Sequence, residues 1–519
     1  MSKIKVINVV DKRGTALDRL AKGAIPYMKN VEYHVVDVHP KKPSVDQLVR
    51  FEELAKDADL IDAHYFRTIE NLRTRYEWLR EKPTILSHFN PYSVTESDWN
   101  DYDLVVGCNQ EIYKRLGEIT QSPVEYVPLT VDTDFWTFNT EWSPNNRVIM
   151  VANRIEGKKG ILPVAQACKK IGAKLVLVGN VSDPDYFHEV IQTGNVEIAQ
   201  NVTDEELRRL YYGASVHVCN SVDNFESGTL PILEAMLCGV PVLTREVGHV
   251  PDMNNGENMV ILDGQPEDID GIAEKLNMML EDAEKLRDLR DKAWQTAKAR
   301  SNERRAYIYQ KLYRQVLYPN QRPVTVITPV CDKAEITEQN VKSVASQTYK
   351  NIEHILINDG EEKQPEPQTP FGLVLRNYQN DYGLARARNK AIIEATGEVI
   401  IFCDQRIIME PDAIERFVEN LQPGKWLWGS KNGIKKEMVE NFSCVERDAI
   451  IRRGMFCERI DRYGALSQYA RSMAKLNGMR LEYIESAKAQ QIGKSSNRNR
   501  RRSEIIKSKT QLWKMNLEG

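Results

Sequence analysis

With 519 residues, 41% of them hydrophobic and 28% charged, the chain has the composition of a globular protein with room for several domains. Its formal net charge of −3 gives no general attraction for polyanions such as nucleic acids. No apolar run approaches the roughly 18 residues of a membrane span, so a transmembrane protein is not expected.

The eight cysteines are scattered and none form a C-x-x-C pair. Several of them, at positions 108, 168, 219, 238 and 403, lie in apolar stretches, which predicts buried free thiols of a reducing compartment. The amino terminus runs directly into an apolar segment and shows no signal-peptide pattern. A cytoplasmic location is the expectation.

The first apolar run, 3–10, is predicted to be a buried strand, and residues 11–15 turn into a helix that starts at Ala16. Strand, glycine turn and helix open a doubly wound α/β unit, whose ligands bind at the carboxyl ends of the strands. Gly14 in this turn is a candidate for close backbone approach to a phosphate or sugar, although an ordinary turn glycine would read the same.

Alternating strand and helix patterns continue to residue 116 and predict a mostly parallel sheet. His88 ends the strand predicted at 83–88, which places it at the ligand-binding edge. A structural histidine is the alternative. The segment YVPLTVDTDFW, 126–136, then leads out of this first α/β part of the chain.

A second α/β part begins with the strand predicted at 148–152, followed by a basic turn at 153–160 and a helix at 162–171. Arg154 and Lys159 in this turn, together with backbone N–H groups at the helix start, suit a diphosphate. A solvated basic turn remains the alternative.

Two acids, Glu226 and Glu234, flank a Gly-Thr-Leu-Pro turn within the stretch NFESGTLPILEAMLCGVPV, 224–242. One acid at the loop and one inside the first turns of the following helix can both point at a ligand held at the helix start. Two solvated glutamates on a surface helix would show the same spacing.

These motifs, followed by VGHVP at 247–251 and NGEN at 255–258, occur in the order found in the large family of retaining GT-B glycosyltransferases often called family 4. The series resembles that family over about residues 1–318. The resemblance implies two Rossmann-like lobes, 1–142 on the acceptor side and 143–318 on the donor side. Two departures are Thr130, where the family has glycine, and the single Gly14, where it has a glycine pair.

The resemblance also implies roles for the site residues. Arg154 and Lys159 would bind the nucleotide diphosphate and stabilise the leaving group, and Glu234 would bind the ribose hydroxyls. Glu226 would contact the donor sugar, and His88 would lie near the anomeric centre. The remaining donor-binding candidates are Gly14, Gly228, Thr229 and Leu230.

A charged helical stretch is predicted at 283–316, and a further α/β part at 323–490 resembles inverting GT-A glycosyltransferases of the family-2 type. The resemblance rests on NDG at 358–360, GLARARN at 383–389 and IIFCDQR at 400–406. It makes Asp359, Arg386 and Asp404 candidates for a second nucleotide site.

Two departures from the family-2 pattern make this last part look degenerate. The metal motif reads Asp404-Gln405-Arg406, so the second carboxylate is missing and Mg²⁺ or Mn²⁺ at Asp404 is doubtful. Where that family places a catalytic base, the chain has 465–468, Ala-Leu-Ser-Gln. An inactive or binding-only domain is favoured over one that is active by other means.

The basic tail, 491–519, is expected to be solvated, with contact to nucleic acid or an anionic membrane as the alternative. Taken together, the sequence predicts an α/β glycosyltransferase that uses a nucleotide sugar, retains the anomeric configuration and needs no metal or other cofactor. A saccharide or lipid-linked glycan is the expected acceptor. Transfer to a modified nucleic-acid base, a nucleotide-sugar-binding scaffold and an epimerase remain open.

Overall fold

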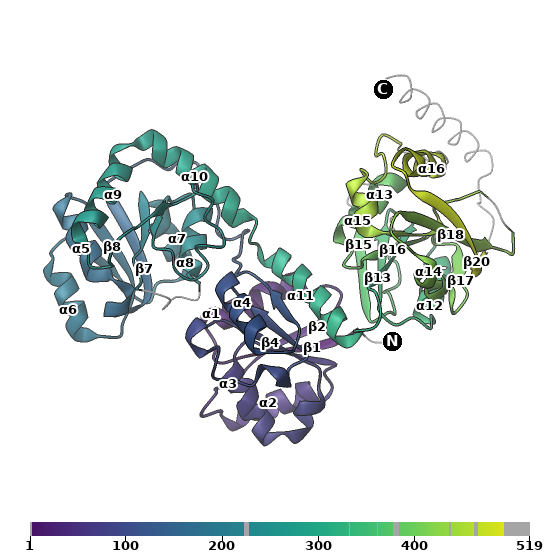
Figure 1. Ribbon diagram of the computed structural model, residues 1–519, viewed down its shortest axis with the longest axis horizontal. Coiled ribbons are helices and arrows are strands. Elements are labelled where there is room, and N and C mark those ends of the chain that lie inside the picture. Colours follow the sequence, from purple (N-terminus) through teal and green to yellow (C-terminus); the bar gives the residue numbers. More distant parts are fainter. Residues whose placement is uncertain are drawn as a thin grey trace. The chain divides into compact units, whose positions relative to one another are not determined.

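The computed structural model describes residues 3–222, 228–331, 333–360, 362–376, 383–434, 437–460 and 466–492. Contacts divide the chain into two compact units. One unit consists of Ile7–Tyr27 and His34–Ile308, and the other of Met1–Val6, Met28–Tyr33 and Tyr309–Gly519. The three sheets follow one another along the chain in the order of the three predicted parts (Figure 1), whose boundaries remain predictions.

The first sheet has the strand order β2-β1-β3-β4-β5-β6, and its strands from β3 onward pair in parallel. Its strands are β1 (Lys5–Val10), β2 (Glu32–Asp37), β3 (Leu60–Ala63), β4 (Thr84–His88), β5 (Leu104–Gly107) and β6 (Val124–Tyr126). The α-helices of this lobe are α1 (Ala16–Ala24), α2 (Val45–Lys56), α3 (Phe66–Arg75) and α4 (Gln110–Ile119).

The second sheet has the order β12-β11-β10-β7-β8-β9, and all of its pairs are parallel. Its strands are β7 (Arg147–Ile155), β8 (Lys174–Val181), β9 (Val196–Ala199), β10 (Val216–Cys219), β11 (Val242–Thr244) and β12 (Val260–Ile261). Its helices are α5 (Ile161–Lys170), α6 (Pro184–Gln192), α7 (Asp204–Tyr212), α8 (Leu230–Leu237), α9 (Ile269–Glu281) and α10 (Ala283–Lys298), and α11 (Asn302–Leu317) follows.

Helices cover both faces of this second sheet (Figure 1), and the sequence of β7 shows why. Val148, Met150 and Ala152 join a core with residues of α5 and α9, whereas Ile149 joins the core formed by α7 and α8. Successive side chains of a strand point to opposite faces, so a continuous apolar run requires cover on both sides. The α/β expectation of two Rossmann-like parallel sheets is confirmed.

The third sheet is mixed, with the order β15-β14-β13-β16-β19-β18-β20-β17. Its strands are β13 (Val324–Val330), β14 (Ile352–Asn358), β15 (Phe371–Arg376), β16 (Val399–Cys403), β17 (Ile407–Met409), β18 (Lys425–Lys431), β19 (Phe442–Glu446) and β20 (Arg480–Gln491). Its helices are α12 (Ala334–Ala345), α13 (Leu384–Glu394), α14 (Ala413–Asn420), α15 (Arg447–Arg452) and α16 (Leu466–Leu476).

Two predicted elements differ from the structure. The continuous helix expected at 283–316 is wrong, because α10 and α11 are separated where Ser301 forms a parallel bridge with Val131. The strand expected to end at Ala152 continues to Ile155 through a register irregularity between Val151 and Arg154. Arg154 therefore lies on the strand and not in the turn.

The five cysteines predicted to be buried, at 108, 168, 219, 238 and 403, are buried free thiols. Within the described part of the chain, no helix combines the length and apolar character that crossing a membrane requires.

Candidate functional site

The end of β7 and the basic loop after it hold two of the predicted phosphate ligands. Arg154 is 60% exposed, and its Nε lies 3.4 Å from Oε1 of Glu156. Lys159 ends the short 3₁₀ turn Gly157–Lys159. Gly160 then adopts a left-handed conformation, with φ of 61°, and caps the start of α5. The loop thus delivers exposed positive charge at a helix amino terminus, where anions are favoured.

Hydrogen bonds join this loop to the segment after the neighbouring strand β10. The N–H of Val222 donates to the carbonyl of Lys158 at 2.9 Å, and Nδ2 of Asn220 donates to the carbonyl of Gly160 at 3.0 Å. Since β7 and β10 are parallel partners, their carboxyl ends meet at one edge of the sheet. The predicted basic turn is therefore brought to the same edge as residues 220–222, and the described part of the second motif, 228–242, follows them in the chain.

At the start of the turn that opens α8, side chains pack closely against Gly228, and a larger residue there would displace them. A Cβ on Gly228 would lie 2.9 Å from Nδ1 of His249 and still closer to Leu129. Thr229 occupies the N-cap position of α8, and its buried Oγ1 has no hydrogen-bond partner among the described residues. Leu230 begins the helix. Glu226, the first predicted acid, lies outside the residues that the structure describes.

Glu234, the second predicted acid, is buried inside α8 with a relative exposure of 2%. Its Oε1 accepts a hydrogen bond from Nη2 of Arg19 at 3.2 Å, and its Oε2 accepts one from the hydroxyl of Tyr211 at 3.4 Å. Burial raises the pKa of Glu234 to about 7, although Arg19 and Tyr211 oppose the shift. The carboxylate therefore lies where α1 of the first lobe meets α8 of the second.

Arg19 is the residue at this site that sequence reasoning missed. It lies on α1, seen in the sequence only as an amphipathic segment, and its Nη2 is also 3.3 Å from Oδ1 of Asp204. The only sequence feature that points to Arg19 is a cation on the first helix after the Gly14 turn. Many surface helices carry such a cation, so this feature does not identify the residue.

Two further candidates come from the first lobe, Gly14 in an exposed turn and His88 in a buried aromatic cluster. Gly14 has φ of 76°, and its N–H donates to Oδ2 of Asp18 at 2.8 Å, so a left-handed turn requires this glycine. His88 is 3% exposed and packs edge-on against Trp99 and Phe66, with ring centroids 4.7 and 5.9 Å away. Burial lowers the pKa of His88 to about 4, so a neutral imidazole is expected at neutral pH.

In the third sheet, a buried arginine links two acids. Nη2 of Arg388 donates to Oδ1 of Asp404 at 2.7 Å, and its Nη1 donates to Oε1 of Glu440 at 2.7 Å. The hydroxyl of Ser467 donates to the other oxygen of Glu440. Burial raises the pKa of Asp404, whereas Arg388 and Ser467 outweigh burial at Glu440 and hold its pKa below the usual value.

This arrangement is a poor match for the divalent cation that the family-2 resemblance implies. A guanidinium already pairs with one oxygen of Asp404, and Gln405, the next residue of the motif, is neutral and hydrogen-bonds Thr337 through Nε2 at 2.5 Å. Among the described residues no group of three or more His, Cys, Asp and Glu side chains is placed to hold a metal ion.

Sequence reasoning also missed Arg388 and Glu440. Ser467 lies in the stretch where an acid was expected, and the acid that contacts it comes from a segment distant in sequence. Of the other candidates, Arg386 pairs with Glu458 at 3.6 Å, and Asp359 follows β14, with its N–H donating to the carbonyl of Val330.

Residues 132–296 match the family model described as glycosyl transferases group 1, and residues 325–440 match the model described as glycosyl transferase family 2. The chain therefore carries two glycosyltransferase domains. The group 1 domain includes α8 and the basic loop after β7, and the family 2 domain includes Arg388, Asp404 and Glu440.

Three curated relatives illustrate the similarity. A glucosyl-dolichyl phosphate glucuronosyltransferase of Haloferax volcanii is 31% identical over 104 residues, which cover 19% of this chain and 33% of that protein. An MMP alpha-(1->4)-mannosyltransferase of Mycolicibacterium hassiacum is 25% identical over 181 residues, covering 33% and 43%. An O-antigen chain mannosyltransferase B of Escherichia coli is 38% identical over 81 residues, covering 16% and 20%. The chain thus spans less than half of each relative.

Among solved structures, the sucrose-phosphate synthase of Thermosynechococcus elongatus superposes with a TM-score of 0.50 at 18% identity. The match covers 61% of this chain and 100% of the synthase. At this level of identity the likeness concerns the fold, and it supports the two-lobed GT-B architecture.

Replacing Gly160 by alanine is expected to destabilise the group 1 domain by about 1–3 kcal/mol, because a Cβ would lie 2.7 Å from Nδ2 of Asn220 and closer to its carbonyl oxygen. The matched control is Gly172→Ala, which has a similar φ of 69° but no atom within 4 Å of the added Cβ. Denaturant unfolding of both variants measures the difference. Equal losses would show that strain, and not the contact with Asn220, makes glycine necessary.

The shifted pKa of Glu234 predicts how stability depends on pH. Between its ordinary pKa of 4.5 and the folded value of about 7, the folded state holds the proton and the unfolded state does not. The free energy of unfolding should therefore fall as pH rises through this window, by about 3 kcal/mol from this group.

Glu234→Gln should remove that loss, so the variant gains stability relative to the parent protein between about pH 4 and about pH 8. Glu205→Gln, an exposed change on α7, is the control. If the free energy of unfolding changes with pH in the same way for Glu234→Gln and for the parent protein, Glu234 does not retain its proton in the folded state.

Arg388→Met is expected to destabilise the family 2 domain by about 3–5 kcal/mol, because it leaves the buried Glu440 and the partly buried Asp404 without their counter-charge. Hydrogen exchange of β16 and β19 in the full chain measures this loss locally. Arg386→Met, two positions away but 48% exposed, should change exchange by no more than about 0.5 kcal/mol. Similar effects of both variants would refute the importance of the buried network.

Proposed function

We propose that the group 1 domain transfers a sugar from a nucleoside diphosphate sugar to a saccharide or lipid-linked glycan, with retention of the anomeric configuration. The observation that carries the proposal is the junction at the carboxyl edge of β7 and β10. There the loop that follows Arg154 and contains Lys159 is hydrogen-bonded to Asn220 and Val222, after which the chain continues to α8 and Glu234.

The proposed chemistry depends on charge at the leaving group. Breaking the bond between the anomeric carbon and the diphosphate leaves negative charge on the departing oxygen, which fixed cations stabilise most strongly in the transition state. Arg154 suits this role because its side chain is 60% exposed at the end of β7 and can reach a ligand from there. Since Arg154 and Lys159 supply the charge, we propose transfer without a metal ion.

Glu234 is proposed to accept hydrogen bonds from the ribose hydroxyls of the nucleotide. Arg19 favours the ionised carboxylate, which is the stronger acceptor, while burial favours the protonated form. Nucleotide affinity should therefore increase as pH rises through about 7. Arg19 would also connect the acid to the first lobe when the donor is bound.

The family 2 domain is proposed to bind a substrate or product and not to catalyse a second transfer. The support is the Arg388 network, in which both Asp404 and Glu440 already accept hydrogen bonds from one guanidinium. A general base must be able to take a proton from the acceptor, and Arg388 makes protonation of Glu440 less favourable.

The deciding experiment is a panel of nucleotide sugars with glycan acceptors, followed by Arg154→Ala. Loss of the cation that stabilises the leaving group should lower kcat by about 10²–10³-fold. Arg147→Ala is the matched control, because this arginine lies at the other end of β7 and pairs with Glu197. Comparable activity in both variants would overturn the donor-site assignment.

The same panel separates the alternatives. Donor binding without turnover would indicate a scaffold, and an isomerised donor in the absence of acceptor would indicate an epimerase. Transfer to DNA and not to glycans would replace the proposed acceptor. Activity that survives Arg154→Ala but disappears in Asp404→Asn would assign catalysis to the family 2 domain.

A further inference from the structure

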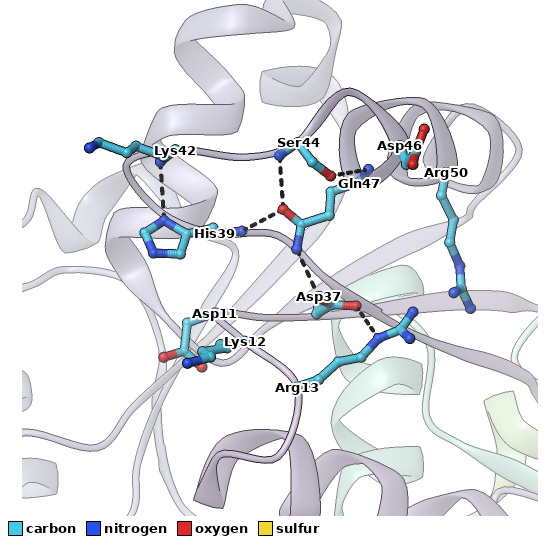
Figure 2. Close-up of a pocket in the computed structure, with 10 residues that line it drawn as sticks. All are labelled: Asp11, Lys12, Arg13, Asp37, His39, Lys42, Ser44, Asp46, Gln47 and Arg50. Carbon is cyan, nitrogen blue, oxygen red and sulfur yellow. Dashed lines mark hydrogen bonds and ion pairs between the residues drawn. The ribbon is translucent and has the colours of Figure 1, made fainter.

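A pocket of about 600 Å³ lies at the carboxyl ends of β1 and β2 in the first lobe (Figure 2). One wall is the turn after β1, and the opposite wall is the segment from His39 to the first turns of α2. Its lining residues are Asp11, Lys12, Arg13, Asp37, His39, Lys42, Ser44, Asp46, Gln47 and Arg50. This volume is large enough for a small organic ligand.

The acids and the cations of this pocket differ in how many hydrogen bonds and ion pairs they already make within the protein. Asp37 accepts hydrogen bonds from Nε of Arg13 and Nε2 of Gln47, both at 2.8 Å. Although partial burial opposes the shift, these donors leave the pKa of Asp37 below its usual value. Asp11 accepts a hydrogen bond from the hydroxyl of Thr15 at 3.1 Å.

The cations, in contrast, keep most of their hydrogen-bonding capacity. Within the described part of the chain, the side chains of Lys12, Lys42 and Arg50 make no hydrogen bond and no ion pair. Arg13 uses Nε for Asp37 and is 66% exposed. Figure 2 shows Arg13 from the turn after β1 and Arg50 from α2 extending toward the same side of the pocket. Asp46, in the first turn of α2, adds a negative charge to the wall that α2 forms.

His39 adds a directed donor. Its Nδ1 accepts hydrogen bonds from the backbone N–H groups of Lys41 and Lys42, at 3.2 and 3.1 Å. A ring nitrogen that accepts carries no proton, so the ring hydrogen lies on Nε2, which can donate to a ligand. Four cationic side chains and the His39 ring thus line a cavity with three acids, of which Asp37 is already paired with Arg13.

We propose that this pocket binds the phosphate group of a phosphorylated saccharide, with Arg13 and Arg50 as its main ligands. Guanidinium groups present paired N–H donors that match phosphate oxygens, and Lys12 adds a point charge. The carboxylate of Asp37, the hydroxyl of Ser44 and the amide of Gln47 line the same pocket and suit the hydroxyls of the attached sugar. This inference rests on the proposed function, since it specifies the acceptor as one that carries a phosphate.

The place of the pocket supports an acceptor in preference to a donor. The turn that forms one wall, 11–15, leads into α1, and Arg19 of α1 contacts Glu234 of the donor lobe. A ligand held at this turn therefore lies on the acceptor-side lobe next to the helix that meets the donor site. Phosphate attached to a free sugar and phosphate linking a sugar to a lipid share this chemistry.

The test is calorimetric titration of the full chain with inorganic phosphate, glucose 1-phosphate and glucose. Both phosphates should bind and glucose should not. Arg50→Gln, which removes an exposed cation that has no partner among the described residues, should weaken glucose 1-phosphate binding about tenfold through loss of a charge-assisted contact. Lys114→Gln is the matched control, an exposed cation of α4 in the same lobe, and it should leave affinity unchanged.

Equal affinity for glucose and glucose 1-phosphate, or equal effects of Arg50→Gln and Lys114→Gln, would overturn the proposal. The proposal would also be overturned if Arg50→Gln weakened the binding of a nucleotide and left the binding of glucose 1-phosphate unchanged. Flotation with phosphatidylcholine vesicles, with and without phosphatidylinositol, decides the source. Retention that needs phosphatidylinositol and Arg50 supports a lipid-linked phosphate, whereas soluble binding alone supports a free sugar phosphate.

Nucleotide titration of the same samples keeps this inference separate from the proposed function. If the parent protein binds glucose 1-phosphate through Arg50 but binds no nucleotide, the donor assignment fails and the phosphate pocket stands. If nucleotide binding depends on Arg154 while glucose 1-phosphate does not bind, the donor assignment stands and the phosphate pocket fails.

Discussion

The parallel pairing of β7 with β10 is the constraint on which the candidate donor site depends. Parallel partners end at the same edge, so the loop that follows β7 and the segment that follows β10 must share space. Asn220 and Val222 convert this proximity into hydrogen bonds with Lys158 and Gly160. Only a glycine fits at 160, because Asn220 fills the volume that a side chain would need.

Two buried ionic contacts illustrate different solutions to the cost of desolvation. Glu234 has one arginine, partly exposed, and burial outweighs it, so the acid retains its proton to about pH 7. Arg388 is fully buried between Asp404 and Glu440, and the two acids together outweigh the burial of its charge and raise its pKa. A buried charge is tolerated only when its partners satisfy it. The first site can still change protonation near neutral pH, whereas the second is a fixed network.

Much of the architecture was predictable because it follows from local periodicity. Buried parallel strands are continuous apolar runs, and the run at 148–152 was recognisable for that reason, although β7 extends further. Cysteine burial at positions such as 168 and 403 follows from the same apolar context. The break between α10 and α11 was not predictable, because helical patterning continues across it and the bridge to Val131 is remote in sequence.

The sequence by itself determined the α/β class, the two glycosyltransferase-like parts and the residue types at the donor loops, since these depend on short-range patterns and fixed spacing. Only the tertiary structure decided which side chains meet. Arg19 reaches Glu234 across 215 positions, Glu440 reaches Ser467 across 27, and Arg50 shares a pocket with Arg13. Charge and hydrogen bonding act over a few ångströms in space, and the spacing of residues along the chain does not encode these distances.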